Sequence, residues 1–371
     1  MLANILVQPG RIEISEIKTP EPSYGEILVK IKAALTCGTD LKAFLRGHPL
    51  IPMPGVFGHE FSGVVAKTGK GVRRFKEGDA VMAVHTAPCL KCIFCRKRLY
   101  NLCEEIMHTK VLGAFAEYIL LPSHVVRQNV FRKPKNLSFE EGAFLEPLSC
   151  VVHSVEPLGI KKGDSALIIG AGPIGLLHLL LLKGKGAKVA VADIKDERLQ
   201  IAKKVGADFV VRTPSPQSHP LKGGEERGDM KNENPVVPSP LEGEGKGEGD
   251  CRAKRFTDGL GFDYVFECTG RPEVWEASVN YVRRGGIVIL FGGCASGTTV
   301  TYETERIHYD EITLKGVFHY TPSDVKKAYK LLCKGELGVS RLISGRYPLE
   351  ELQKAFHKLA NVEGIKYAII P

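Results

Sequence analysis

The chain has 371 residues, of which 43% are hydrophobic and 25% are charged. This length allows two or three domains, and the composition is ordinary for a soluble globular protein. The net charge of +9 could suit nucleic-acid binding, but the basic residues are scattered and only the RKR run at 96–98 is concentrated. No apolar run approaches the roughly 20 residues that a membrane span needs. We therefore expect neither a nucleic-acid partner nor a membrane.

Residues 1–148 are expected to be rich in short strands. Apolar segments such as EILVKIKA and DAVMAVH alternate there with turns of Gly, Pro and Asp. Two short motifs in this block, TCGTD and GHE, contribute Cys37, His59 and Glu60. Alone, such a Cys is usually a small buried residue and such a His a satisfied polar one. Together, a thiolate, an imidazole and a carboxylate are a ligand set for a zinc ion that keeps one position open.

Four cysteines follow in the stretch CLKCIFCRKRLYNLC, at Cys89, Cys92, Cys95 and Cys103. Gaps of two residues let neighbouring thiolates converge on one tetrahedral ion, and the longer gap returns a fourth ligand. Four sulfur ligands predict a closed structural zinc site. A disulfide knot is disfavoured because MLANILVQ begins like a strand and lacks the features of a secretory leader. A redox dithiol needs two cysteines and leaves the other two unexplained.

From 149 to 300, strands and helices alternate, which predicts a parallel sheet with covering helices. The expected strands are SALIIG, KVAVAD, DFVV, DYVFEC and GIVILFG. The first ends in GAGPIG, with Gly170, Gly172 and Gly175 before an apolar helix. Glycines in this pattern allow a tight turn, the close approach of a pyrophosphate and the packing of helix on strand. Asp193, 18 residues after Gly175, ends the next strand, as a dinucleotide site requires.

Residues 212–252 interrupt this pattern with Pro, Gly, Glu, Ser and Lys, and they repeat PSP-containing segments imperfectly. Such a composition cannot anchor a core, so we expect a disordered, low-complexity insertion without a role in catalysis. A docking tail is the functional alternative, and no motif supports it. The segment 301–371 is expected to return to the first domain with mixed strands and two amphipathic helices, near 323–334 and 349–360.

The chain resembles the zinc-dependent medium-chain dehydrogenases, in particular their sorbitol (polyol) and threonine dehydrogenase branch. The motifs appear in family order: CGTD at 37–40, GHE at 58–60, the four-cysteine segment, EPLS at 146–149, GAGPIG at 170–175, ECTG at 267–270 and LKGVFHY at 314–320. The resemblance implies an α/β fold with a GroES-like catalytic domain at 1–148 that carries both zinc sites. It also implies a doubly wound Rossmann domain at 149–300.

The resemblance also implies roles for individual residues. Glu146 of EPLS resembles a carboxylate that sits against the catalytic zinc or its water, and Glu60 resembles the acidic residue that accompanies this zinc. Thr39 resembles the hydroxyl that first takes the substrate proton. Lys42 stands where the family's proton relay often has a His, so either Lys42 or nearby His48 could complete the relay.

Another departure is His319, which stands where polyol enzymes carry an Arg before the matching Tyr320. It weakens the case for a polyol substrate and leaves the redox step untouched.

The cofactor is expected to be NAD, because Asp193 can accept hydrogen bonds from the adenosine ribose and would repel a 2′-phosphate. Arg198 matches an Arg that packs beside the adenosine in the family. The other expected cofactor-binding residues belong to the same glycine turn or to the later ECTG and FG segments: Gly170, Gly172, Pro173, Ile174, Gly175, Thr269, Phe291 and Gly292.

The expected function is hydride transfer from a secondary alcohol to NAD+, with two zinc ions per chain. A sorbitol/L-iditol 2-dehydrogenase is the leading expectation, and an L-threonine 3-dehydrogenase or another zinc alcohol dehydrogenase is the alternative. Two readings of a different class are a zinc ribbon that contacts nucleic acid and a non-catalytic relative. The first leaves GHE, EPLS and GAGPIG unexplained, and the intact zinc ligands oppose the second. We expect a cytoplasmic homo-oligomer, either a dimer or a tetramer, acting on a small alcohol.

Overall fold

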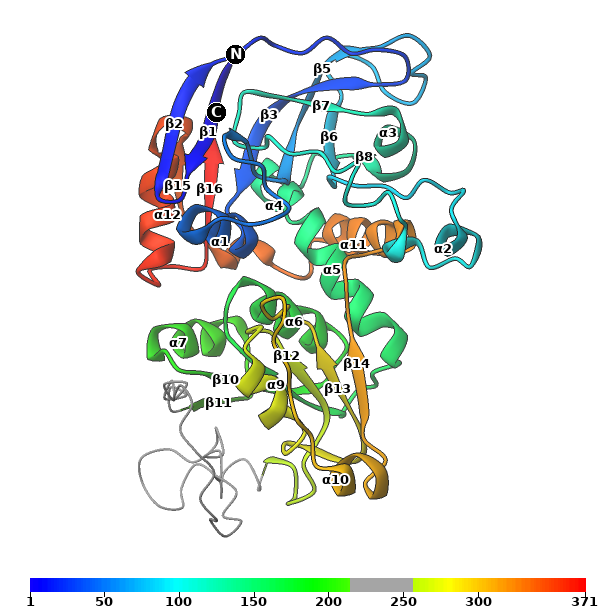
Figure 1. Cartoon of the computed structure of the whole chain (residues 1–371), viewed down its shortest axis with the longest axis vertical. Helices are drawn as coiled ribbons and strands as arrows, with labels where there is room; N and C mark the ends of the chain where they lie inside the picture. The colour runs from blue at the N-terminus through cyan, green and yellow to red at the C-terminus, as the bar shows by residue number, and fades with distance from the viewer. Residues whose placement is uncertain (214–255) are drawn as a thin grey trace, which may run out of the picture. The chain divides into compact units, whose positions relative to one another are not determined.

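The computed structural model describes residues 1–213 and 256–371, which form two compact units (Figure 1). Unit 1 comprises Met1–Ile160, Leu176–Lys185 and Val317–Pro371, and unit 2 comprises Lys161–Gly175 and Gly186–Gly316. Apart from its first two residues, the insertion expected at 212–252 lies outside the described residues. In the described parts of the chain, no helix combines the length and the hydropathy that a membrane crossing needs.

Unit 1 is built on a seven-stranded sheet in the order β15-β16-β3-β5-β6-β8, with β7 also paired to β3. The central strand β3 has seven buried apolar residues on its two faces, because helices and the other strands cover it. A smaller antiparallel sheet has the order β2-β1-β4. The strands are β1 (Leu2–Gln8), β2 (Arg11–Glu16), β3 (Ile27–Leu35), β4 (Gly55–Val56), β5 (Glu60–Thr68), β6 (Ala80–Ala83), β7 (Tyr118–Leu121), β8 (Val130–Arg132), β15 (Ile343–Pro348) and β16 (Lys366–Ile370).

The helices of unit 1 include the two predicted in the C-terminal segment. One of them, α11, starts at a capping box in which Thr321 and Asp324 bond each other's backbone amides. The other, α12, buries Phe356 against Phe44 and Phe57, with ring centroids 5.5 and 5.8 Å apart. The helices are α1 (Gly38–Arg46), α2 (Ile93–Arg96), α3 (Ser123–Asn129), α4 (Phe139–Ala143), α5 (Leu145–Val155), α11 (Pro322–Lys334) and α12 (Leu352–Ala360).

Unit 2 contains a six-stranded, fully parallel sheet in the order β11-β10-β9-β12-β13-β14. Because β9 lies between β10 and β12, the strand order reverses beside it, and ligands bind at such a switch point in open α/β sheets. The strands are β9 (Ser165–Ile169), β10 (Lys188–Asp193), β11 (Phe209–Arg212), β12 (Phe262–Glu267), β13 (Val282–Leu290) and β14 (Thr313–Gly316). The helices are α6 (Pro173–Gly184), which starts in this unit, α7 (Asp196–Val205), α9 (Pro272–Ser278) and α10 (Thr304–Tyr309).

The five strands expected in this region are all present, and the structure adds a sixth. Strand β14 was expected to belong with the returning C-terminal segment, but it pairs in parallel with β13, from Ile287↔Thr313 to Leu290↔Gly316. The chain therefore enters unit 1 again at Val317 rather than at about residue 301. β14 is a partly exposed edge strand of the sheet, with Ile312 buried just before it. The sequence of this short segment does not indicate which strand it pairs with.

Candidate active site

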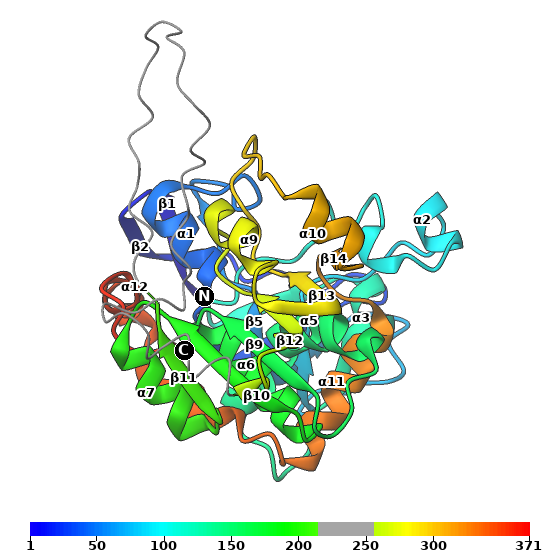
Figure 2. The same ribbon diagram turned by 90° about the horizontal axis from the view of Figure 1, so that it is seen from below.

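The four-cysteine segment forms a small lobe that the figures place at the outer margin of unit 1, around α2 (Figure 1, Figure 2). The Sγ atoms of Cys89, Cys92, Cys95 and Cys103 all lie within 4.8 Å of one another. Backbone amides already point at this cluster, since Cys92 N–H donates to Cys89 Sγ at 3.4 Å and Cys89 N–H donates to Cys103 Sγ at 3.3 Å. Four sulfurs with N–H···S support fit a closed tetrahedral zinc site.

The electrostatics of the lobe favour thiolates at its outer positions. A hydrogen bond from the Lys91 amide lowers the pKa of Cys89, and one from the Cys95 amide lowers the pKa of Cys92 to about 6. The lobe has only a small core, in which Cys95 and Cys103 pack with Ile106. In a lobe with so few apolar contacts, a metal ion held by the four cysteines would supply much of the stability.

Cys37, His59 and Glu60 also converge, with one potential ligand atom from each lying within 4.8 Å of the others. Cys37 is the residue that precedes α1, and it makes no capping hydrogen bond through its side chain. His59 and Glu60 stand at the start of β5 and are 7% and 0% exposed. The structure thus brings Cys37 next to two potential ligands, His59 and Glu60, that follow it by more than twenty residues in the sequence.

Two further buried residues support this group. Asp40 on α1 places Oδ1 3.3 Å from Nδ1 of His59. Burial by itself lowers the pKa of His59, but Asp40 and Cys37 together raise this pKa well above 6.5. Lys366 on β16 forms an ion pair with Oε2 of Glu60 and donates to the Thr36 carbonyl at 2.8 Å. Oε1 of Glu60 is buried without a hydrogen-bond partner. A carboxylate oxygen in that state, beside a thiol and an oriented imidazole, fits a zinc ligand.

Glu146 lies on α5, is 6% exposed, and has a pKa raised to about 7, chiefly by burial. Its Oε1 is 3.5 Å from Nδ1 of His85, whose own pKa is lowered well below 6.5 by burial. By ligand-atom distance, Glu146 groups with Cys150 and His319 rather than with the Cys37 group. A carboxyl that titrates near neutral pH is suited to proton transfer.

The candidate relay residues lie on or just after α1. Thr39 is half-buried in the first turn of the helix, and Lys42 is exposed. His48 is half-buried, accepts a hydrogen bond from the Leu50 amide at 3.2 Å through Nδ1, and has a pKa lowered by burial and then by Lys42. A His48 that is neutral near pH 7 could accept a proton at its other nitrogen.

The glycine turn of unit 2 has the shape that a dinucleotide site requires. Gly170 adopts φ +104°, and a Cβ on Gly175 would lie 1.8 Å from the Gly170 carbonyl oxygen. A Cβ on Gly172 would meet nothing within 4 Å, so the backbone is open there. The turn leads directly into Pro173, at the start of α6, followed by Ile174. Open backbone at a helix N-terminus is where a pyrophosphate binds.

Asp193, the last residue of β10, holds the neighbouring loops in place through hydrogen bonds. Asp193 accepts hydrogen bonds from the amides of Ala171 (2.7 Å) and Lys195 (2.9 Å), and Arg198 Nη1 lies 3.9 Å from its Oδ2. Asp193 therefore joins the end of β10 to the glycine turn. Its carboxylate keeps acceptor capacity for a further donor, because each oxygen can accept more than one hydrogen bond.

A second buried carboxylate, Glu267 at the end of β12, holds the ECTG loop. It accepts from the amides of Thr269 (2.6 Å) and Gly270 (3.0 Å), and its carbonyl accepts from Phe291 and Gly292 at 3.0 Å each. The methyl group of Thr269 would lie 3.0 Å from a Cβ at Gly170. The structure thus places Thr269, Phe291 and Gly292 around one loop cluster that includes the glycine turn.

Sequence reasoning missed several residues of the site. Asp40 is the last residue of the CGTD motif, but its contact with His59 depends on the first turn of α1, which the motif alone does not predict. His85, Cys150 and Lys366 carry no motif. A charged Lys in the otherwise apolar β16 was the one local signal for the ion pair with Glu60.

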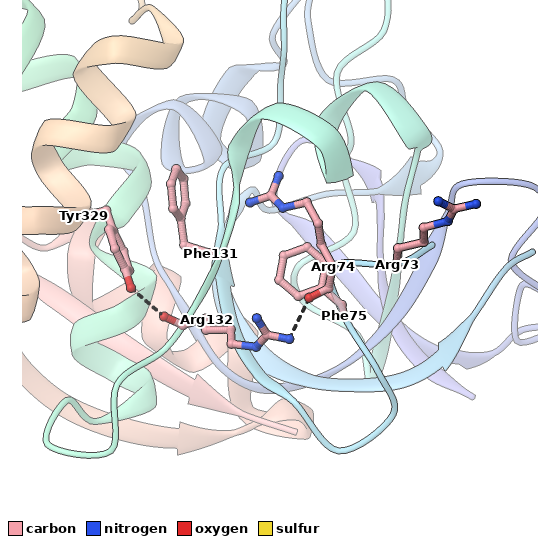
Figure 3. A pocket seen from close by; sticks show the side chains of 6 residues that line it. All are labelled: Arg73, Arg74, Phe75, Phe131, Arg132 and Tyr329. Carbon is pink, nitrogen blue, oxygen red and sulfur yellow. Dashed lines mark hydrogen bonds between the residues drawn. The ribbon is translucent and has the colours of Figure 1, made fainter. Parts of the chain in front are cut away.

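A surface pocket of about 480 Å³ in unit 1 contains none of these residues. It is lined by Arg73, Arg74, Phe75, Phe131, Arg132 and Tyr329 (Figure 3). Arg74 donates to the carbonyls of Arg127 and Val130, and Arg132 donates to the Arg74 carbonyl and to Asp79. These two guanidinium groups therefore tie loops together, and the pocket offers no acid, base or metal ligand for the reaction.

Comparison with known families and proteins matches both parts of the chain. Residues 23–133 match the alcohol dehydrogenase GroES-like domain, and residues 242–334 match the zinc-binding dehydrogenase family. A D-arabinitol dehydrogenase of Uromyces fabae is 31% identical, with 100% of this chain and 97% of the relative covered. A sorbitol dehydrogenase of Halalkalibacterium halodurans is 29% identical, with 100% and 99% covered.

A solved structure agrees with the fold. A protein from Sinorhizobium meliloti described as a zinc-binding dehydrogenase, solved with NADP, has a TM-score of 0.81 at 29% identity and covers 100% of this chain and 99% of its own. The chain is an oxidoreductase that acts on alcohols with zinc and a nicotinamide dinucleotide. It belongs to the zinc-dependent medium-chain dehydrogenase family, in the branch of the polyol dehydrogenases.

Proposed function

We propose that the chain oxidises an uncharged polyol or a related secondary alcohol at a zinc ion held by Cys37, His59 and Glu60, with Glu146 beside it. The sorbitol/L-iditol 2-dehydrogenase reaction is the leading candidate. The observation that carries the proposal is the buried Oε1 of Glu60, which has no hydrogen-bond partner and lies beside His59, whose Nδ1 is 3.3 Å from Oδ1 of Asp40. The names of relatives, which include sorbitol and D-arabinitol dehydrogenases, support a polyol.

When bound, zinc supplies a Lewis acid for the substrate hydroxyl, and the nicotinamide supplies the hydride acceptor. The chain's own residues set the geometry and move the proton. Asp40 orients His59, and Lys366 balances the charge of Glu60. Glu146, with a pKa of about 7, holds or releases a proton at Oε1 toward His85. Thr39 is proposed as the first proton acceptor, and His48, whose pKa is lowered chiefly by burial, is proposed as the next base.

The surroundings of Glu146 favour an uncharged substrate over a sugar phosphate. Burial lowers the pKa of His319 to about 3, so this imidazole is neutral where polyol enzymes have a positive Arg. The hydroxyl of Thr86 lies 2.6 Å from Nε2 of His319 and donates to the Tyr320 hydroxyl at 2.9 Å. Hydroxyl groups and a neutral ring can hydrogen-bond substrate hydroxyls, but they cannot compensate a phosphate dianion.

A substrate panel tests this proposal. The purified protein should form NADH with sorbitol, xylitol, D-arabinitol or an inositol, and at least about tenfold more slowly, as kcat/KM, with their phosphates; this ratio corresponds to about 1.4 kcal/mol. L-threonine and 2,3-butanediol represent the alternative substrate classes. Faster turnover of L-threonine would move the assignment to a 3-dehydrogenase. Loss of turnover in every member of the panel, with zinc bound, would favour a non-catalytic relative.

NAD is proposed as the preferred dinucleotide, because the Asp193 carboxylate repels a 2′-phosphate and can accept a ribose hydroxyl. In the Asp193→Ser variant, the preference for NAD over NADP should shrink by about 1–3 kcal/mol, with Lys195 available to the phosphate. The measurement is the ratio of kcat/KM values for the two cofactors. Asp196→Ser is the matched control, since Asp196 is exposed and pairs with Arg212. Equal use of both cofactors by the wild type would contradict the proposal.

We also propose a cytoplasmic homo-oligomer, either a dimer or a tetramer. The nine cysteines within the described residues are all free thiols, which suits a reducing compartment. The four-cysteine lobe exposes four large apolar side chains, and such a patch commonly marks a protein contact; they are Leu90, Ile93, Leu99 and Leu102. Light scattering on the eluted protein measures the assembly, and a monomer at micromolar concentration would contradict this proposal.

A further inference from the structure

A second mixed group of metal-binding side chains lies in unit 1 beside the Cys37 group. It consists of Glu146 and Cys150, which are one turn apart on the same face of α5, and of His319, which precedes α11. One ligand atom from each residue lies within 4.8 Å of the other two. The three atoms are a carboxylate oxygen, a thiol sulfur and an imidazole nitrogen, a set that zinc accepts at sites with one open position.

Glu146 is buried, and its polar contacts come from His85 and Cys150. Its Oε1 lies 3.5 Å from Nδ1 of His85 and 4.0 Å from Sγ of Cys150. Glu60, which is also buried, forms an ion pair with the ammonium group of Lys366. Within the described residues, Glu146 forms no such ion pair with a lysine or an arginine. A bound metal ion would place a positive charge directly at its carboxylate.

His319 is held in an unusual conformation that aims its ring at this group. Its φ of +61° lies in the left-handed region, which is strained for a non-glycine residue. The ring is fixed on both sides, since Nε2 contacts the Thr86 hydroxyl at 2.6 Å and the plane stacks on Tyr320 with centroids 3.9 Å apart. Strain that the surroundings maintain in this way is typical of functional positions.

We propose that Glu146, Cys150 and His319 form a third metal position, which binds a divalent ion of zinc-like softness next to the catalytic zinc. Ligand atoms around a tetrahedral zinc lie about 3–4 Å apart, given bond lengths of about 2.0–2.3 Å. The observed separations, all within 4.8 Å, therefore need only small side-chain movements to close on an ion. With the ion bound, Glu146 would be a deprotonated ligand of this position, so its proton exchange with His85 would belong to the state without the third ion. The Cys37 group would hold the catalytic zinc through its own three side chains.

Zinc stoichiometry tests the proposal, with the intact protein first dialysed until it holds two ions per chain. Titration with zinc against a chromophoric chelator should reveal one further ion in the wild type. In Cys150→Ser and His319→Asn, the affinity for this ion should fall by more than about 100-fold, because even residues that only support a ligand are worth 10–100-fold. Cys333→Ser, on α11, is the matched control and should bind the third ion normally.

A second readout does not depend on affinity. Cadmium-113 NMR of the cadmium-loaded wild type should show three resonances, and Cys150→Ser should lose one of them. Two resonances in the wild type, or no third ion up to millimolar free zinc, would overturn the proposal. A third ion that persists in Cys150→Ser would overturn it as well, since that ion would occupy another surface. The number of bound ions does not depend on which alcohol is the substrate. A missing third ion is therefore distinguishable from a failure of the proposed function.

Discussion

The two proposed zinc sites of unit 1 are built in opposite ways. The four-cysteine lobe takes all its ligands from one segment of 15 residues, Cys89–Cys103, with backbone amides of the same segment as support. The Cys37 group takes its ligands from two elements, and its support comes from α1 and from β16, near the other end of the chain. The lobe is therefore a local structure, whereas the Cys37 group exists only after the long-range sheet has formed.

Because of this difference, we expect metal loss to affect stability at the four-cysteine lobe and catalysis at the Cys37 group. A local site with few apolar contacts relies on its metal to stay folded, so its loss should appear as unfolding. A site assembled on a packed sheet already has its fold, so the loss of its metal should appear as lost activity. Four substitutions, taken from the largest expected effect to the smallest, examine this contrast.

Cys95→Ala removes a buried ligand of the lobe. Zinc content should fall by one ion, and the lobe should unfold and become sensitive to protease, because zinc binding is worth about 10 kcal/mol or more in peptides that fold around zinc. Differential scanning calorimetry and limited proteolysis between residues 89 and 103 measure the effect. Cys333→Ala is the control for the loss of a cysteine. A wild-type melting curve with one zinc missing would mean that the lobe folds without metal.

Cys37→Ala removes a ligand of the other site. The zinc count should again fall by one, but the melting temperature should stay close to that of the wild type. Turnover should fall by about 10³-fold or more, since a Lewis-acid metal supplies several kcal/mol of transition-state stabilisation. Elemental analysis, calorimetry and NADH formation are measured on one preparation. Retained activity would remove Cys37 from the catalytic site.

Lys366→Met leaves the buried carboxylate of Glu60 without its cation. The free energy of unfolding should fall by about 3–5 kcal/mol, because breaking a buried pair leaves an uncompensated charge. Urea denaturation measures this, and the double variant with Glu60→Gln should recover part of the loss. Lys354→Met is the surface control, since Lys354 pairs with Glu351 in solvent and should contribute less than about 1 kcal/mol. Equal effects in the two variants would contradict the role of burial.

Asp40→Asn keeps the shape of the residue that orients His59 and removes its charge. Zinc affinity at the Cys37 group should fall by about 10–100-fold, the usual cost of losing a carboxylate behind a ligating His. Competition with a chelator measures it, and the zinc of the four-cysteine lobe serves as the internal reference. Asp196→Asn, an exposed acid, should change neither site. Release of both ions in parallel would show that Asp40 acts on the whole unit.

The sequence was sufficient wherever a structure depends on neighbouring residues. The cysteine spacing predicted the clustered lobe, and the glycine pattern predicted a turn between β9 and α6. The sequence was not sufficient to predict contacts between residues of distant elements. The pairing of β14 with β13 and the ion pair of Lys366 with Glu60 depend on the sheets as assembled, and no local period encodes them. The grouping of Glu146 with Cys150 and His319 has the same origin, since a loop before α11 meets one face of α5.

The position of Lys366 has a consequence for synthesis on the ribosome. The cation that balances Glu60 is carried by β16, a strand translated after all of unit 2. Until β16 pairs with β3 at Leu35 and Ala34, the nascent unit 1 lacks both a strand of its sheet and the counter-charge of its metal pocket. Folding during translation would therefore favour completion of unit 2 first, and a ribosome that stops before codon 366 would leave a chain without a finished catalytic domain.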